Sequence, residues 1–259
     1  DMDRVVIKDG LQGLVDLYRF SDGTVWTHQQ LLDHLAATQS GSSGDDVLVG
    51  RGGTDVIHGL AGSDVISGYE GGDDLYGDGD NDTLFGGAGF DYLYGGDGND
   101  VLNGGADPDY LFGDAGDDVV FGGDGNDAIL GDDVVPDVNA PGFSTTVAGS
   151  DELHGGDGND TLYGLNYKDQ ASAALRAGND ILEGGAGNDI LSSQGGSDYL
   201  DGGTGADSMG GGTGNDTYVV DDTGDIVGEN AGAGTDLVLS WITYALTTNV
   251  ENLTLTGSS

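Results

Sequence analysis

Large apolar side chains recur along the chain at every ninth residue. Residues 41–130 form ten consecutive nine-residue units without a gap, and the eighth position of every unit is aliphatic. These aliphatic residues are Leu48, Ile57, Ile66, Leu75, Leu84, Leu93, Leu102, Leu111, Val120 and Ile129. One apolar side chain in nine cannot give a unit its own core, so neighbouring units must stack. Because side chains alternate along a strand, each unit is predicted to contain a very short strand whose middle side chain points inward.

Two further positions are equally constant, and they predict a turn between the strands. The first residue of each unit is glycine, at Gly41, Gly50, Gly59, Gly68, Gly77, Gly86, Gly95, Gly104, Gly113 and Gly122. The sixth is aspartate, at Asp46, Asp55, Asp64, Asp73, Asp82, Asp91, Asp100, Asp109, Asp118 and Asp127. Glycine supplies the positive φ angles and the close backbone approach that such a turn requires. Two consecutive units would then make one coil, giving two parallel sheets joined by turns at both edges.

After this first block the period is interrupted twice. The predicted segments are a first repeat block at 41–131, an insertion at 132–147, further repeats at 148–164, a second insertion at 165–176 and a degenerating repeat block at 177–239. The sixth-position aspartates of the later repeats are Asp151, Asp160, Asp180, Asp189, Asp198, Asp207 and Asp216. The inward column continues with Leu182, Leu191, Leu200, Met209 and Tyr218. Insertions in repeat proteins leave from one edge, either as tolerated surface loops or as carriers of function.

The two ends of the chain lack the nine-residue period. Residues 1–40 are predicted to cap the first coil with a hairpin and a short helix, because an open end would expose backbone groups. Their expected strands lie at residues 4–8, 14–20 and 24–26. Thr27 and Gln30 form a capping box, which predicts a helix to about Ala37. A longer ordinary strand is expected over residues 237–246, and residues 240–259 supply flanking strands and a connector.

The charge of the chain is extreme. It has 47 acidic and 6 basic residues among 259, a formal net charge of −41. Such a charge excludes nucleic acids and anionic membranes as default partners and opposes compaction. With 53 glycines and 7% aromatic residues, the metal-free chain is expected to resemble a disordered polymer. No apolar segment approaches the length of a membrane-spanning helix, so no membrane span is predicted.

Stacking the turns would place carboxylates on carboxylates, which is unfavourable unless a cation lies between them. The available ligands are carboxylate and backbone carbonyl oxygen atoms, and cysteine is absent. Oxygen ligands select a hard ion, and calcium tolerates an irregular geometry better than magnesium does. The seventeen sixth-position aspartates given above are therefore the candidate metal ligands, and the metal is expected to be Ca²⁺ bound as several ions.

Residues 95–103 read Gly-Gly-Asp-Gly-Asn-Asp-Val-Leu-Asn, which resembles the G-G-x-G-x-D-x-U-x repeat of the RTX, or haemolysin-type calcium-binding, family. The resemblance implies an all-β, right-handed parallel β-roll with each ion between a turn and the next turn on the same edge. Asp46 would pair with Asp64 and Asp55 with Asp73, and ten turns would enclose about eight ions. Backbone carbonyls would complete the sites, from turn residues such as Gly86, Gly87, Gly89, Gly95, Gly96, Gly98, Gly122, Gly123, Gly125, Gly184, Gly185 and Gly187.

The resemblance also implies a function. Such a module folds on binding extracellular calcium and assists the secretion and stability of a larger bacterial protein, which is exported in one step by type I secretion machinery. The chain ends at Ser259 within repeat-like sequence, so we expect it to be a piece of a longer secreted protein. It is not expected to be an enzyme, because every aspartate has an identical neighbour along the ladder and none is singled out. A catalytic domain would lie elsewhere in the parent protein.

An alternative function, that of an adhesin or a polysaccharide-binding accessory module, rests on the two insertions or on aromatic side chains on one face. The outward ninth positions of the even units are His58, Tyr76, Tyr94, Phe112 and Leu130, and their seventh positions add Tyr92 and Tyr110. The odd units have Val49, Ser67, Phe85, Asn103 and Phe121 at the ninth position, a smaller and more mixed set. Such a stripe could dock a neighbouring domain, another copy or a polysaccharide, as in an adhesin or an accessory module. It could equally reflect only that aromatic residues suit flat strands.

Overall fold

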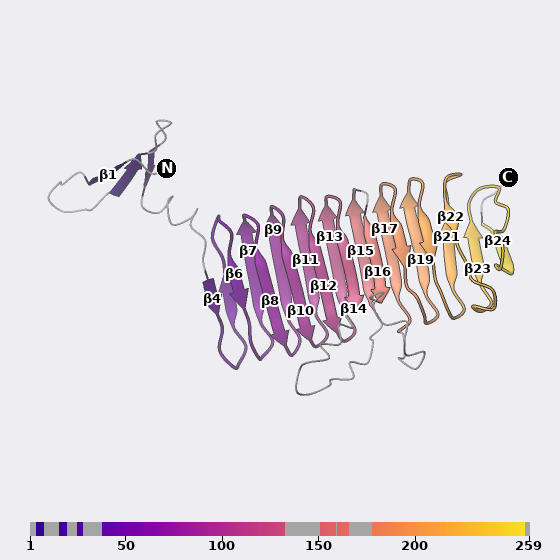
Figure 1. Ribbon diagram of the computed structural model, residues 1–259, viewed down its shortest axis with the longest axis horizontal. Helices are drawn as coiled ribbons and strands as arrows, with labels where there is room; N and C mark the ends of the chain where they lie inside the picture. Colours follow the sequence, from indigo (N-terminus) through magenta and orange to yellow (C-terminus); the bar gives the residue numbers. More distant parts are fainter. Residues whose placement is uncertain are drawn as a thin grey trace.

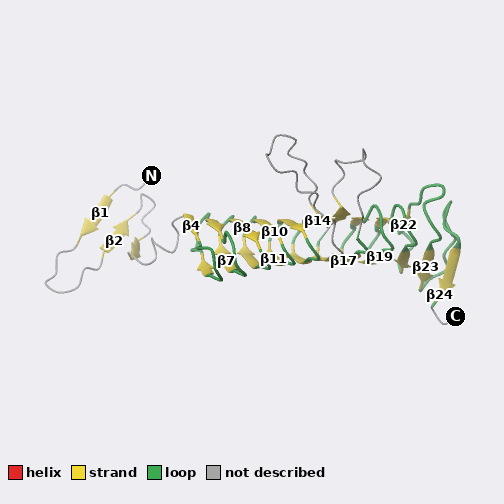
Figure 2. Cartoon of the chain, turned by 90° about the horizontal axis from the view of Figure 1, so that it is seen from below, coloured by secondary structure: helices red, strands yellow, loops and turns green. Residues whose placement is uncertain are grey.

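The protein is described from a computed structural model, which places residues 4–7, 16–19, 25–27, 38–132, 151–158, 160–165 and 178–256. From residue 38 onward these residues form an all-β parallel solenoid of about ten turns (Figure 1). The described residues contain strands and turns but no helix. Successive strands alternate between two sheets that lie as two layers along the long axis (Figure 2). The parallel-sheet architecture predicted from the nine-residue period is therefore confirmed.

Each sheet contains every second strand of the solenoid. The ten-stranded sheet consists of β4 (Thr38–Ser40), β6 (Val56–His58), β8 (Asp74–Gly79), β10 (Tyr92–Asp97), β12 (Tyr110–Ala115), β14 (Ala128–Asp132), β16 (Thr161–Leu165), β18 (Ile190–Ser192), β20 (Ser208–Gly210) and β22 (Ile226–Val227). The eleven-stranded sheet consists of β5 (Val47–Val49), β7 (Val65–Glu70), β9 (Thr83–Ala88), β11 (Val101–Ala106), β13 (Val119–Asp124), β15 (Glu152–Asp157), β17 (Ile181–Ala186), β19 (Tyr199–Thr204), β21 (Thr217–Val220), β23 (Leu237–Ser240) and β24 (Asn252–Leu255).

The register of the strands places equivalent residues of successive coils beside one another. Leu93 of β10 pairs with Leu75 of β8 on one side and with Leu111 of β12 on the other, a spacing of two repeat units each way. The eighth-position side chains form one buried column, in which every member from Ile57 to Ile129 is 0% exposed. The column continues through Leu153 and Leu162 to the later members predicted from sequence. Leu48, in the first coil, is only partly buried.

Most of the strands are longer than the very short strand predicted for each unit. A typical strand, such as β10, begins at the seventh position of one unit and ends at the third position of the next. The ladder to β12 pairs residues 92–94 and then Gly96 and Asp97, passing over Gly95. Gly96 has a φ of 109°, a conformation that costs glycine little. The strand therefore bends at the glycine pair and keeps its parallel partners, so only the fourth to sixth positions remain as a turn.

At the N-terminus, β1 (Arg4–Ile7), β2 (Asp16–Arg19) and β3 (Val25–Thr27) form an antiparallel sheet in the order β1-β2-β3. The three strands predicted there are confirmed. The helix expected from Thr27 to about Ala37 is not supported: Thr27 ends β3, and the residues after it lie outside the described part of the chain. Thr38–Ser40 already belongs to the solenoid, because β4 pairs with β6.

Both expected insertions lie almost wholly outside the described residues, yet the solenoid continues across them. Strand β14 pairs with β16, β13 with β15, and β15 with β17, all in parallel. The two gaps follow β14 and β16, which belong to the same sheet. Near the C-terminus the strand expected over residues 237–246 is shorter, Leu237–Ser240, and the following β24 pairs with it in parallel. This last pair breaks the alternation between sheets.

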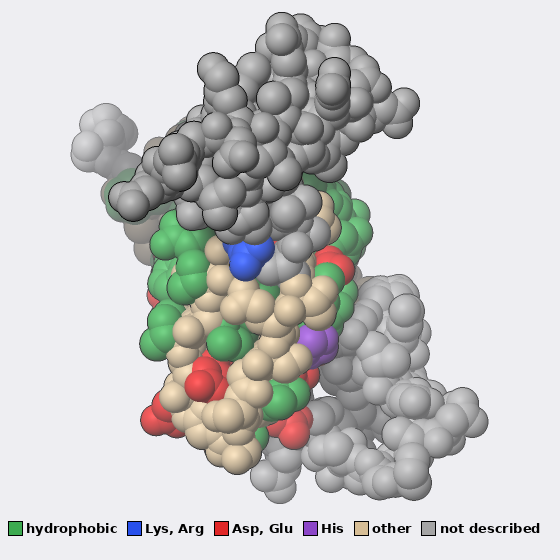
Figure 3. Space-filling view, turned by 90° about the vertical axis from the view of Figure 1, so that its left-hand side faces the viewer, with side chains coloured by type: hydrophobic (Ala, Val, Ile, Leu, Met, Phe, Trp, Pro, Cys, Tyr) green, Lys and Arg blue, Asp and Glu red, His purple; other side chains and the backbone are tan. Residues whose placement is uncertain are grey.

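The register between coils also stacks aromatic rings on the outer face of the ten-stranded sheet. Ring centroids lie 4.3 Å apart for His58 and Tyr76, and 4.8 Å apart for Tyr76 and Tyr94 and for Tyr94 and Phe112. The interplanar angles are 7°, 2° and 4°, so the rings lie face to face. Hydrophobic side chains line the flanks of the solenoid when it is seen from the end at which the array begins (Figure 3). The predicted stripe therefore exists as a ladder of stacked rings.

A test of the turn conformation uses Tyr69, which has a φ of 84° at the second position of its unit, where some other units, such as those with Gly87 and Gly96, have glycine. A left-handed conformation costs an L-residue about 1–2 kcal/mol, and replacing that residue by glycine relieves this strain. Glycine in turn costs about 0.5–1 kcal/mol, because it has greater freedom in the unfolded chain. We therefore expect Tyr69→Gly to stabilise the folded protein by about 0.5–1 kcal/mol. The measurement is the thermal unfolding of the variant and of the unchanged chain under conditions in which both are folded.

The matched control is Tyr69→Ala, which removes the ring but keeps the Cβ atom. If the alanine variant is stabilised as much as the glycine variant, backbone conformation is not the cause.

Candidate metal site

Each sixth-position aspartate is fixed between two coils by hydrogen bonds of the main chain. Its N–H group donates to Oδ1 of the aspartate one coil further on, as from Asp82 to Asp100 at 2.7 Å and from Asp91 to Asp109 at 2.9 Å. Its carbonyl oxygen accepts the first ladder hydrogen bond of the next coil's strand, as Asp82 does from Val101 at 2.9 Å. The carboxylate therefore lies at the corner where the turn becomes a strand.

These contacts assemble the aspartates into two columns, one along each edge of the solenoid. The column that precedes the strands of the eleven-stranded sheet contains Asp46, Asp64, Asp82, Asp100, Asp118, Asp151, Asp180, Asp198, Asp216 and Asp236. The opposite column contains Asp55, Asp73, Asp91, Asp109, Asp127, Asp160, Asp189, Asp207 and Asp225. All seventeen sequence-predicted aspartates are in the columns, with the predicted pairing of Asp46 with Asp64 and Asp55 with Asp73.

The columns extend further than the sequence pattern indicated. They cross both insertions, since Asp118 N–H donates to Asp151 Oδ1 at 3.0 Å and Asp151 N–H donates to Asp180 Oδ1 at 3.1 Å. Asp236 N–H donates to the Glu251 carboxylate at 3.0 Å, so a glutamate continues the first column. Sequence reasoning missed Glu251 because it follows the preceding aspartate at a shorter spacing than that of the regular coils.

The second oxygen of most of these carboxylates, Oδ2, is buried without a hydrogen-bond partner. This holds for Asp64, Asp73, Asp82, Asp91, Asp100, Asp109, Asp118, Asp127, Asp189, Asp198, Asp207, Asp216 and Asp236. In the first two turns the N–H groups of Ser42 and Arg51 donate to Oδ2 of Asp46 and Asp55. Neither Ser42 nor Arg51 has a positive φ, whereas the second-position residues from Leu60 to Gly123 do. A buried acceptor with no donor is costly, so these atoms need a positive partner.

The first-position glycines leave room beside these oxygen atoms. A Cβ atom on Gly86 would lie 2.5 Å from Oδ2 of Asp91 and 2.6 Å from the carbonyl oxygen of Gly104 in the next coil. Real Cβ atoms do not approach this closely, so close contact, rather than a positive φ, requires glycine here. A carboxylate oxygen and a carbonyl oxygen thus converge over the bare Cα atom.

The carbonyls predicted as ligands fall into groups by turn position. First-position carbonyls lie beside the preceding coil: Gly86, Gly95, Gly122 and Gly184. Carbonyls of second and fourth positions lie beside the following coil: Gly87, Gly98, Gly123, Gly125, Gly185 and Gly187. Gly89 and Gly96 have the positive φ angles of the fourth and second positions, 122° and 109°. The role of all these atoms as metal ligands stays a prediction.

Burial and mutual repulsion make the columns hard to ionise. Burial raises the pKa of Asp91, Asp100 and Asp118 to about 7 and that of Asp109 to about 8, from an ordinary value of 3.8. The hydrogen bond from the preceding coil lowers these pKa values but does not offset burial, and the charge of the neighbouring aspartate raises them further. The same causes raise the pKa of Asp73, Asp82, Asp189 and Asp207 to about 6. A nearby cation would remove this cost.

The sequence matches the RTX calcium-binding nonapeptide repeat family over residues 40–75, 76–111, 103–133, 145–166, 176–209 and 188–218. Together these segments cover more than half of the chain. The chain belongs to the RTX calcium-binding repeat family. A comparison with curated proteins found no match. Within the described ranges no helix is long and apolar enough to span a membrane.

The RTX turns of this chain fit calcium. In the turns that the structure describes, the atoms that converge are oxygen atoms, namely the Oδ2 atoms without a donor and nearby carbonyls. Hard cations prefer such ligands, and calcium accepts the irregular arrangement that a turn offers. Together with family membership, this supports a calcium-binding module.

The role of the first-position glycine can be tested with Gly86→Ala. We expect this change to raise the calcium concentration needed for folding, because the new methyl group would displace Asp91 Oδ2 or the Gly104 carbonyl. Gly79→Ala is the matched control, since its Cβ atom would meet only the Leu60 carbonyl at 3.7 Å. Calcium titrations followed by circular dichroism measure both variants. Equal midpoints for the two variants would contradict the proposed close contact.

The raised pKa values predict a pH dependence of calcium binding. A carboxyl group whose pKa is higher in the folded form than in the unfolded chain stabilises the folded form below the unfolded pKa, and this contribution is lost as the pH rises through the folded pKa. Protonated columns cost less to bury than charged ones, so the calcium-free folded form should gain stability as the pH falls from about 8 to about 6, the range of the raised pKa values. The calcium concentration at the folding midpoint is therefore expected to fall as the pH falls from 8 to 6 at constant ionic strength. A midpoint that rises or stays constant over this range would contradict the raised pKa values.

Proposed function

We propose that this chain is a calcium-driven folding module of a larger exported bacterial protein. The observation that supports it best is the pair of carboxylate columns, in which most of the buried Oδ2 atoms, such as those of Asp82, Asp91 and Asp100, have no hydrogen-bond donor. A chain of net charge −41 that buries such columns is poorly stable without cations and well stabilised with them. Calcium therefore decides between an expanded chain and the folded β-roll.

This dependence suits export. Inside a cell, where calcium is scarce, the chain stays unfolded and can be threaded through type I secretion machinery. Outside, calcium at millimolar concentration folds it, because extracellular calcium modules have dissociation constants on the order of 10⁻⁴ to 10⁻³ M. Each ion orders a turn that the next ion shares, so binding is cooperative. Folding at the exit then prevents the chain from sliding back and stabilises the secreted protein.

We assign no catalytic step to this chain. The interior is a single column of aliphatic side chains, and the buried acids are equivalent members of two ladders. Repeat domains of this family are structural calcium-binding modules. Any enzymatic activity would belong to another domain of the parent protein.

Binding of a polysaccharide or another partner by the aromatic stripe stays a prediction. The rings of Tyr76 and Tyr94 are covered on their faces by their neighbours in the ladder and offer mainly their edges. A sugar would stack on exposed ring faces. A second stack, between Phe121 and His154 on the eleven-stranded sheet, shows that ring stacking is not confined to one face. The geometry therefore favours a role in strand packing.

The test is circular dichroism of the chain during titration with calcium and, separately, with magnesium. We expect a disordered spectrum in excess chelator, a β-sheet spectrum at millimolar calcium and little response to magnesium, which dehydrates reluctantly. A full β-sheet spectrum in chelator at neutral pH would contradict the proposal, as would equal folding by magnesium.

A further inference from the structure

The last complete turn on the edge before β21 differs from the other turns. In most other turns the first-position glycine is approached by the carbonyl of the next coil, but Gly211 is approached by the hydroxyl group of Tyr218. Gly211 N–H donates to this hydroxyl oxygen at 2.6 Å, and the hydroxyl donates to Glu229 Oε1. Glu229 follows Gly211 by two repeat units, so a glutamate occupies the place of the next first-position glycine. A carboxylate thus replaces a backbone carbonyl at this turn.

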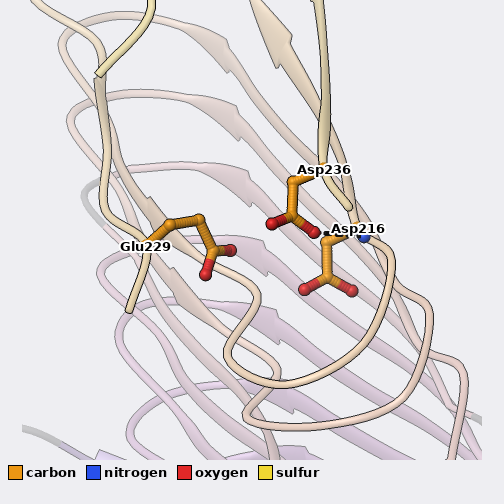
Figure 4. Close-up of side chains that lie close together, drawn as sticks. All are labelled: Asp216, Glu229 and Asp236. Atoms are coloured by element: carbon orange, nitrogen blue, oxygen red, sulfur yellow. Dashed lines mark hydrogen bonds between the residues drawn. The ribbon is translucent and has the colours of Figure 1, made fainter. Parts of the chain in front are cut away.

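Three carboxylates meet at this point. Oxygen atoms of Asp216, Glu229 and Asp236 all lie within 4.8 Å of one another, and the three side chains face a common space (Figure 4). Asp216 is 1% exposed and Asp236 is 0% exposed. Their Oδ2 atoms have no hydrogen-bond partner. This arrangement is unfavourable for three negative charges unless a cation joins them.

No described protein group nearby supplies a positive charge that would offset the three carboxylates. The N–H groups of Asp198 and Asp216 donate to Oδ1 of Asp216 and of Asp236, at 2.9 and 3.0 Å, and leave both Oδ2 atoms unpaired. Tyr218 donates to Glu229 and holds its carboxylate toward the aspartates. Among the described residues, the ion pairs involve only His58 and His154, which lie on other strands.

We propose that the calcium ion between Asp216 and Asp236 is also bound by Glu229, in a site that differs chemically from those of the regular repeats. This proposal rests on the proposed calcium-dependent function, and it adds Glu229 as a side-chain ligand that the nonapeptide pattern does not contain. Three carboxylates bind calcium more tightly than two, because affinity follows the charge of the ligand set. Tyr218 is a positioning residue that orients Glu229.

The site ties together a part of the chain in which the repeat spacing fails. Asp216 and Asp236 are separated by 20 residues, two more than the aspartates of a regular coil, and β22 between them has only two residues. An ion held by both aspartates and by Glu229 fixes this irregular coil against the regular array. The ion thereby stabilises the solenoid at the point where the regular repeat ends.

The test compares Glu229→Gln with Glu183→Gln, a control glutamate that is exposed on β17. Bound calcium is counted by native mass spectrometry, and folding is checked by circular dichroism in saturating calcium. Glu229→Gln should keep the β-sheet spectrum and bind one ion fewer than the unchanged chain, while Glu183→Gln should bind the full number. An unchanged ion count for Glu229→Gln would overturn this inference alone, whereas an unchanged chain that binds no calcium would overturn the proposed function itself.

A second measurement applies if Glu229→Gln does not fold. The unchanged, calcium-loaded chain is mixed rapidly with a fluorescent chelator, and the release of ions is followed in time. The proposal predicts a slow phase with an amplitude of one ion, from the site with three carboxylates. Release of all ions in a single phase would contradict it.

Discussion

Repulsion between carboxylates stacked one coil apart is the constraint on which this structure depends. The register that buries the aliphatic column also places aspartates directly above one another along both edges. In the regular coils the main chain donates to one oxygen of the carboxylate, as at Asp100 and Asp109, and leaves the other oxygen buried without a donor. The hydrophobic column and the acidic columns therefore act in opposite directions, and a cation between turns lets both exist in one fold.

The glycines follow from the same geometry, and they serve different purposes at different positions. First-position glycines such as Gly86 make room for a carboxylate and a carbonyl over a bare Cα atom. Second- and fourth-position glycines such as Gly96 and Gly98 have positive φ angles that bend the strand into the turn. Side chains at the second position are tolerated when they lie outward, as at Leu60, although its φ of 84° carries strain. The regular glycine pattern thus results from close backbone contacts between coils and from the backbone conformation of the turns.

Much of the fold could be predicted from the sequence, because a strict period fixes both the register and the buried face. The aliphatic column and both aspartate columns follow directly from counting in nines. The longer strands could not be predicted in this way, since glycine pairs normally indicate a turn, and only the structure shows that Gly96 keeps its parallel partners. The expected helix after Thr27 rested on a capping box, which is a local signal, and Thr27 instead ends strand β3.

In the candidate site, too, some residues follow from the repeat period and others do not. The nine-residue period predicts which aspartates of the regular array line the site. It does not predict Glu229 or Glu251, because neither occupies a position at which the repeat has an acidic residue. The side chain of Tyr218 was predicted only as a member of the inward column. Its hydroxyl reaches Gly211 and Glu229 because the column ends near it, and such a contact depends on three-dimensional position rather than on period. Irregular ends of repeat arrays therefore carry the features that sequence periodicity cannot show.

The most direct test of the central claim is X-ray diffraction from crystals grown in calcium, with anomalous scattering used to locate the ions. The account predicts rows of calcium ions along both edges of the solenoid, each within about 2.3–2.6 Å of a sixth-position carboxylate oxygen. Well-ordered turns without ions in such crystals would contradict it.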